Sequence, residues 1–154
     1  MSLISQILTQ NDIINFSEIE ILNGYLEKNI PVELIPNIAP TLKLLQLIRN
    51  EIGKPIIVHS TYRNKEHNLE CGGKPNSLHL AFNAIDFAPV DTSYSELQQI
   101  RSKFLARTYV FQFDFKGTTY MVTPNLCGIG LYHTFIHIDT RGLLGRPSPA
   151  VWKG

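Results

Sequence analysis

Histidines and aspartates occur close together in short segments of this sequence, and in combination they could bind a metal ion. His79, His133 and His137 lie in polar or strand-end contexts beside carboxylates. In a strand over residues 135–139, alternate side chains point to the same face, so His137 and Asp139 share one face. The isoleucines between and before them point to the other face and can enter the core.

Asp86 and His79 can join the same cluster. Alternation over residues 83–88 places Asp86 between two alanines, which leaves room for an ion above the sheet. His79 follows a loop that contains two glycines, and a turn there would bring it back beside Asp86. Two imidazoles and one carboxylate leave the fourth tetrahedral position of zinc open for water, as in hydrolytic zinc sites. The same pattern also fits a hydrogen-bonded His–Asp pair that holds no metal.

Length and charge limit the classes of protein to consider. The 154 residues predict one domain over residues 1–154, and a 44% hydrophobic content is typical of a soluble globular protein. The formal charge of +1 supplies no field for binding nucleic acid or an anionic membrane. We expect neither partner, and we expect Cys71 and Cys127 to be unpaired buried thiols. The first 15 residues have no Lys or Arg and no secretory signal pattern, so we expect synthesis in the cytoplasm and delivery by another component.

The elements that must position these side chains follow from local patterns. Ser17 with Glu20, and Ser93 with Glu96, are capping boxes that predict helix starts, and the first of these helices should end near Lys28. Further segments are predicted as a helix over 42–52, strands over 56–58 and 83–88, a hairpin over 110–122, and strands over 128–132 and 135–140. Because helices dominate the first half and strands the second, the sequence predicts an α+β fold with a mainly antiparallel sheet and flanking helices.

Three blocks of the sequence resemble one peptidase family. Residues 77–86 (SLHLAFNAID) resemble the S-x-H-x-x-G-x-A-x-D motif of the zinc D-Ala-D-Ala carboxypeptidase and dipeptidase family. That family includes phage L-alanyl-D-glutamate endolysins and shares its fold with the hedgehog signalling domain. Residues 60–63 (STYR) resemble its S-x-Y-R segment, and residues 135–142 (FIHIDTRG) resemble the closing block of its small phage-type and murein endopeptidase-like branch. The resemblance therefore implies a fold of the hedgehog/D-Ala-D-Ala peptidase kind.

The resemblance also implies roles for individual residues. One zinc ion would be bound by three ligands, His79, Asp86 and His137. Arg63 would hold a substrate carboxylate or the developing oxyanion, since a guanidinium matches paired oxygens. Two further residues of the matching blocks, Ser77 and Tyr62, are expected to contact substrate.

The sequence departs from the family pattern at two positions. Phe82 replaces the motif glycine, which costs energy if that residue needs a positive φ and otherwise would narrow the cleft. Thr134 stands where many relatives carry an acidic general base, and its hydroxyl cannot accept a proton from a zinc-bound water at neutral pH. Asp139 is the candidate for the base, or for the group that orients a histidine ligand, and His133 is its rival as the base.

These residues together predict a zinc-dependent peptidase that hydrolyses amide bonds in peptidoglycan stem or cross-link peptides. By resemblance it would be a phage or prophage endolysin that reaches the cell wall after release, or a virion-associated hydrolase. The alternative is a zinc-binding structural module on the same fold that has lost catalysis, as Thr134 would permit.

Overall fold

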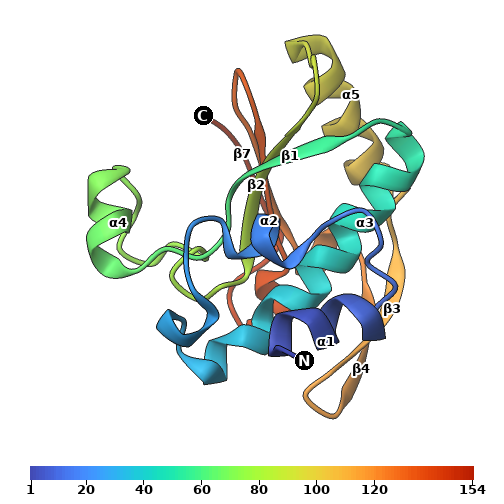
Figure 1. Cartoon of the computed structure of the whole chain (residues 1–154). Helices are drawn as coiled ribbons and strands as arrows, with labels where there is room; N and C mark the ends of the chain where they lie inside the picture. Colours follow the sequence, from blue (N-terminus) through green and yellow to red (C-terminus); the bar gives the residue numbers. More distant parts are fainter.

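The N-terminal half of the chain is mainly helical and the C-terminal half supplies most of the strands (Figure 1). The structure is a computed structural model that describes residues 1–154. The α-helices are α1 (Leu3–Gln10), α2 (Glu18–Leu22), α3 (Ala39–Ile52), α4 (Lys65–Glu70) and α5 (Tyr94–Leu105). The strands are β1 (Ile56–Ser60), β2 (Ala84–Pro89), β3 (Phe111–Phe115), β4 (Thr118–Val122), β5 (Gly128–Leu131), β6 (Ile136–Asp139) and β7 (Ala150–Lys153). Short 3-10 helices cover Glu27–Asn29, Val32–Ile38, Pro124–Leu126 and Arg141–Leu144.

Five strands form one sheet in the order β1-β2-β6-β5-β7, and β3 pairs with β4 as a separate hairpin. Every pair in these sheets is antiparallel except β5 with β7, which run parallel. The prediction of an α+β fold with a mainly antiparallel sheet and flanking helices is confirmed. Strand β7 was not predicted, because four residues near the end of the chain become a strand only through pairing with β5.

Both predicted helix caps form, and the first is a complete capping box. The Ser17 hydroxyl accepts a hydrogen bond from the Glu20 amide at 3.2 Å, and the Glu20 carboxylate accepts one from the Ser17 amide at 2.7 Å. Ser93 likewise caps α5 by accepting from the Glu96 amide. The predicted end of the first of these helices near Lys28 is wrong: α2 stops at Leu22, because Asn23 adopts a left-handed conformation with φ 48° that ends the helix.

Helix α1 is a further element absent from the prediction. It begins after Ser2, whose hydroxyl accepts a hydrogen bond from the Ser5 amide at 3.0 Å. Its one fully buried side chain, Ile4, contributes to a core of 30 buried residues that also includes residues of α3 and the sheet. A helix of eight residues is not stable alone and forms because it packs against the rest of the molecule. A local apolar pattern does not reveal such packing.

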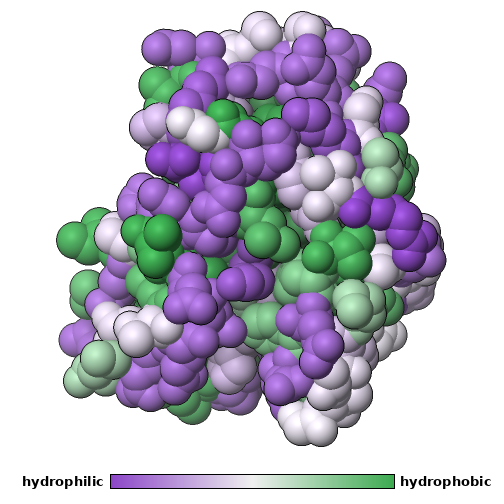
Figure 2. Space-filling model, turned by 90° about the vertical axis from the view of Figure 1, so that its right-hand side faces the viewer, coloured by the Kyte–Doolittle hydropathy of each residue, from purple (hydrophilic) through white to green (hydrophobic).

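The core of the molecule lies where α3 crosses the sheet in Figure 1. Leu42, Leu45 and Ile48 of α3 are fully buried, and so are Ile85 of β2 and Ile138 of β6. Large apolar side chains also occur at the surface, and Figure 2 shows hydrophobic areas interrupted by hydrophilic ones on one face of the molecule. None of the helices has the length and apolar character that crossing a membrane requires.

The two cysteines are unpaired and differ in environment. Cys127 is buried, and burial together with the charge of Asp139 raises the pKa of its thiol to about 12. Cys71 is exposed, so the prediction that both thiols are buried is wrong for Cys71. The reason is its position at the end of α4, which projects with its following loop from one side of the molecule (Figure 1).

Candidate metal centre

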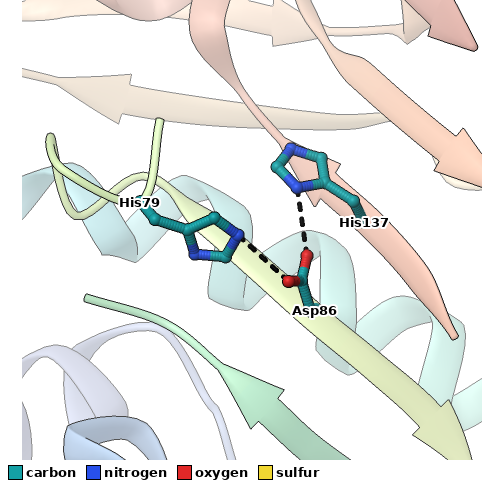
Figure 3. A group of neighbouring side chains, drawn as sticks. All are labelled: His79, Asp86 and His137. Atoms are coloured by element: carbon teal, nitrogen blue, oxygen red, sulfur yellow. Dashed lines mark hydrogen bonds and ion pairs between the residues drawn. The ribbon is translucent and has the colours of Figure 1, made fainter. Parts of the chain in front are cut away.

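Strand register brings an aspartate and a histidine together at the middle of the sheet. In the antiparallel β2–β6 pair, Asp86 lies directly opposite His137, and the His137 Nδ1 atom is 3.0 Å from the Asp86 Oδ1 atom (Figure 3). The His79 Nε2 atom approaches the other carboxylate oxygen, Oδ2, at 3.2 Å. One donor atom from each of the three residues lies within 4.8 Å of the others, and all three side chains are buried. They form the group of metal-binding side chains that the sequence predicts.

A tight turn before β2 presents His79. The Ser77 hydroxyl accepts a hydrogen bond from the His79 amide at 3.2 Å, and the His79 carbonyl accepts from the amides of Phe82 and Arg63. The turn requires φ 53° at Phe82, so the residue that replaces the motif glycine does occupy a left-handed position. Such a conformation costs a non-glycine residue roughly 1–2 kcal/mol.

Phe82 does not narrow a cleft, because its side chain is fully buried. The ring packs edge-on against Tyr62, with 6.0 Å between the ring centroids. Burial of an aromatic ring in the core thus offsets the backbone cost at this position.

Hydrogen bonds fix the orientation of both imidazoles. The His79 Nδ1 atom donates to the Thr61 carbonyl at 2.6 Å, and the His137 Nε2 atom donates to Asp139 Oδ2 at 2.7 Å. The remaining ring nitrogens, His79 Nε2 and His137 Nδ1, face the Asp86 carboxylate, so a proton or a metal ion must lie between each nitrogen and the carboxylate oxygen that it approaches.

The separations between donor atoms suit zinc. The two nitrogen–oxygen distances of 3.0 and 3.2 Å are slightly shorter than the separations of about 3.3–3.5 Å between tetrahedral ligands bound at 2.0–2.2 Å. Two imidazoles and one carboxylate are also ligands that zinc prefers. In both distance and chemistry, His79, Asp86 and His137 fit one zinc ion.

Charge in the centre is distributed between His137 and two aspartates. Burial alone would lower the pKa of His137, but hydrogen bonds to Asp139 and Asp86 raise it to about 9. Burial would raise the pKa of Asp86, but hydrogen bonds from His137 and His79 hold it well below its usual range. The pKa of Asp139 is lowered in the same way, against the effect of burial, by hydrogen bonds from Arg141 and His137.

Asp139 lies behind His137 and has no exposed surface. Its Oδ1 atom accepts hydrogen bonds from the Arg141 amide at 3.1 Å and from Arg141 Nε at 2.9 Å. Its Oδ2 atom accepts from Arg141 Nη2 at 2.8 Å and from His137. Because both oxygens are already occupied and none faces solvent, the geometry favours the role of orienting His137 over that of a general base.

Arg63 reaches the centre, and Tyr62 does not. The Arg63 Nη2 atom lies 3.3 Å from Asp86 Oδ2, while its Nε atom donates to the Ser60 hydroxyl at 3.1 Å. The Tyr62 ring is only 7% exposed and packs in the core against Tyr25 and Phe82. A direct contact of Tyr62 with substrate, as the sequence predicted, has no support in this placement.

His133, the rival candidate for the base, and Thr134, which replaces the acidic base of many relatives, lie before β6. His133 and Thr134 are both exposed, and the His133 ring packs against Tyr94 at 5.0 Å between centroids. Neither makes a hydrogen bond to His79, Asp86 or His137.

Two other residues adjoin the centre although the sequence did not single them out as site residues: Arg141, which binds Asp139, and Trp152 of β7, whose ring centroid lies 5.0 Å from that of His137. The position of Arg141 two residues after Asp139 could have indicated that the two side chains pair. No local pattern indicates that Trp152 lies beside His137.

A family model described as Peptidase M15 matches residues 10–139 of the chain. The matched region contains the three candidate metal ligands, Arg63 and Asp139, and it ends before Arg141 and Trp152. No curated protein matches the chain. The match covers most of the sequence and agrees with the resemblance read from its motifs, and the His–Asp–His group agrees with the zinc dependence of the family. The chain therefore belongs to the peptidase M15 family of zinc D-Ala-D-Ala carboxypeptidase-like metallopeptidases.

Proposed function

We propose that this metallopeptidase hydrolyses amide bonds in the stem or cross-link peptides of peptidoglycan. One observation carries the catalytic part of the proposal: two imidazoles and a carboxylate from separate segments converge with donor atoms within 4.8 Å of one another. A zinc ion bound there would supply a water of pKa about 7 as nucleophile and would polarise the scissile carbonyl. The peptidoglycan part is supported by the resemblance of residues 77–86 and 135–142 to wall-degrading members of the family.

Arg63 would bind the substrate in this proposal. Its guanidinium uses Nη2 and Nε for Asp86 and Ser60, and a guanidinium has five N–H donors in total. The remaining donors suit a carboxylate of the peptide or the oxyanion that develops during hydrolysis. Stem peptides of peptidoglycan contain free carboxylates, which is why an arginine beside the centre fits this substrate class.

Proton transfer is the step for which the chain offers the fewest groups. Thr134 has no basic atom of suitable pKa, and both oxygens of Asp139 are occupied by Arg141 and His137. His133 remains the proposed proton-transfer residue, because its side chain is exposed and histidine is the residue that most often acts as a general acid or base.

The same shortage favours a second candidate function, a zinc-binding module without peptidase activity. In the described chain, Asp86 and Asp139 are the only carboxylates that hydrogen-bond within the centre, and each already serves His137. A protein of this kind would bind zinc through the same three residues and leave peptides intact.

Digestion of purified murein separates the two candidates. The zinc-loaded protein, the protein with a chelator, and a His137→Ala variant would each be incubated with murein, and soluble muropeptides would be identified by mass spectrometry. New peptide masses from the zinc-loaded protein alone support the peptidase and identify the bond. Bound zinc with intact murein and intact D-amino-acid peptides supports the binding module.

We also propose that the natural role is that of a phage or prophage endolysin or a virion-associated hydrolase. The support is the likeness of residues 135–142 to the small phage-type branch of the family. Addition of the protein to bacteria with a permeabilised outer membrane tests this role, and lysis that depends on zinc is the expected result.

A further inference from the structure

A continuous series of contacts leads from the C-terminal strand to one of the metal-binding histidines. The Trp152 ring lies against the Arg141 guanidinium, with 5.4 Å between the guanidinium carbon and the ring centroid. Arg141 binds both oxygens of Asp139, and Asp139 accepts a hydrogen bond from His137. The Trp152 Nε1 atom also donates to the Tyr132 hydroxyl at 3.0 Å, so the indole is fixed at its far side as well.

Two glycines of β5 provide the space for these contacts. Gly128 pairs with Asp139 and Gly130 pairs with His137 across the β5–β6 ladder. A Cβ atom at Gly128 would lie 2.6 Å from Asp139 Oδ2 and 2.8 Å from Arg141 Nε, and one at Gly130 would collide with the Trp152 ring. Neither glycine has a positive φ. Glycine is therefore needed at both positions because it leaves space for Asp139, Arg141 and Trp152, and not because of its backbone conformation.

We infer that Arg141 and Trp152 are positioning residues of the metal centre, which hold Asp139 and thereby fix the His137 ring with its Nδ1 atom facing Asp86 and His79. An imidazole can turn its two nitrogens in different directions, and the hydrogen bond to Asp139 selects one orientation. Asp139 can serve in this way because Arg141 pairs with its fully buried carboxylate, which would otherwise be costly to bury. Trp152 covers the guanidinium by stacking, an arrangement that suits arginine.

This inference rests on the proposed binding of zinc by His79, Asp86 and His137, and not on the identity of the substrate. Its test is zinc affinity, measured by competition with a chromophoric chelator for the wild type and for an Arg141→Gln variant. Loss of partners that orient a metal ligand typically lowers affinity 10–100-fold, and we expect about this reduction. Arg141→Lys keeps the charge without the paired donors, so we expect an intermediate affinity.

Arg146→Gln is the matched control. Arg146 belongs to the same C-terminal segment, but its guanidinium donates to the Asn76 carbonyl and makes no contact with Asp139. We expect zinc affinity within about twofold of the wild type for this variant. The absorption spectrum of the cobalt-loaded protein is a second measurement, because it reports ligand geometry and should change for Arg141→Gln but not for Arg146→Gln.

Gly128→Ala and Trp152→Ala test the inference without removing any hydrogen bond to Asp139 directly. The first crowds Asp139 and Arg141, and the second exposes the guanidinium, so both should lower zinc affinity and alter the cobalt spectrum. Far-ultraviolet circular dichroism and cooperative thermal unfolding of the metal-free variants ensure that folded protein is compared. Trp152→Ala, at a partly exposed site, decides the question if Arg141→Gln does not fold. Wild-type affinity and spectrum in the folded variants would overturn the inference alone, whereas a wild-type protein that binds no zinc would overturn the proposed function with it.

Discussion

Asp86 and His137 face each other across the β2–β6 ladder, and the Oδ1 and Nδ1 atoms lie 3.0 Å apart. The register of the two strands sets this relationship. A slip by one residue would turn one of the two side chains to the opposite face of the sheet and would expose the isoleucines that now face the core. The metal centre and the hydrophobic core are therefore specified by the same strand pairing.

Replacement of Asp86 by Asn is expected to lower zinc affinity by at least about 100-fold, because it removes the charged ligand that both histidines approach. The bound metal would be counted by atomic emission after dialysis. Asp114→Asn is the matched control, since Asp114 is an exposed carboxylate on β3 that binds Thr119. Equal zinc content in both variants would contradict the assignment of the ligand.

Zinc binding is expected to strengthen with rising pH up to about pH 9. The pKa of His137 in the metal-free protein is about 9, so at lower pH zinc must displace the proton from Nδ1 of that ring, since Nε2 donates to Asp139. Apparent affinity should change by about tenfold for each pH unit below that value. Chelator competition between pH 6.5 and 9.5 measures how the apparent zinc affinity depends on pH. An affinity that does not change with pH would show that His137 carries no extra proton in the metal-free protein.

The metal-free protein is expected to lose stability as the pH rises from about 6.5 to about 9. Because the pKa of His137 rises from 6.5 to about 9 on folding, its contribution to the free energy of unfolding is complete below pH 6.5 and is lost as the pH rises through 9. The shift corresponds to about 3 kcal/mol. The lowered pKa values of Asp86 and Asp139 act in the opposite sense, since their contribution is lost only in acid.

Urea unfolding at pH 6 and pH 10 in the presence of chelator measures the loss, and His137→Gln is the control that should remove most of the difference. Zinc should restore stability at pH 10, because it replaces the lost proton between His137 and Asp86.

Phe82→Gly and Phe82→Ala separate the two opposing effects at this position. Both variants lose the buried ring, and both should be less stable than the wild type. For Phe82→Ala the free energy of unfolding should fall by about 3–5 kcal/mol. Glycine relieves the positive φ of 53°, so Phe82→Gly should be more stable than Phe82→Ala by about 1 kcal/mol. Chemical denaturation of both proteins gives the difference, and an alanine variant as stable as the glycine variant would contradict strain at this residue.

His133→Ala is expected to lower the turnover number on muropeptides by about 100-fold or more and to leave zinc affinity unchanged, as for loss of a general acid or base. Thr134→Ala, at the adjacent exposed residue, is the control and should retain activity. Full activity in His133→Ala would remove His133 from the mechanism. Thr134→Glu, which restores the carboxylate of many relatives, would then be the variant to test for a gain of turnover.

Local patterns in the sequence were sufficient for the parts of the fold that depend on neighbouring residues. The alternation of side chains predicted that His137 and Asp139 share one face of their strand and that Asp86 lies opposite Ile85 and Phe87 on its own strand. The resemblance joined Asp86 to His137, and the register places these two residues opposite each other. The capping serines of α2 and α5 were predicted for the same reason, since their partners are three residues away. The motif around His79 indicated the remaining ligand.

Only the tertiary structure determined the surroundings of these ligands. Strand β7 forms because β5 pairs with it, and this pairing alone brings Trp152 beside His137. The burial of Tyr62 and Phe82 and the enclosure of Asp139 by Arg141 likewise depend on segments far apart in the chain. The sequence by itself determined which side chains can bind a metal and on which face they lie, because periodicity and capping act over a few residues. Which groups orient and enclose them was decided by packing, since contacts between distant segments leave no periodic pattern in the chain.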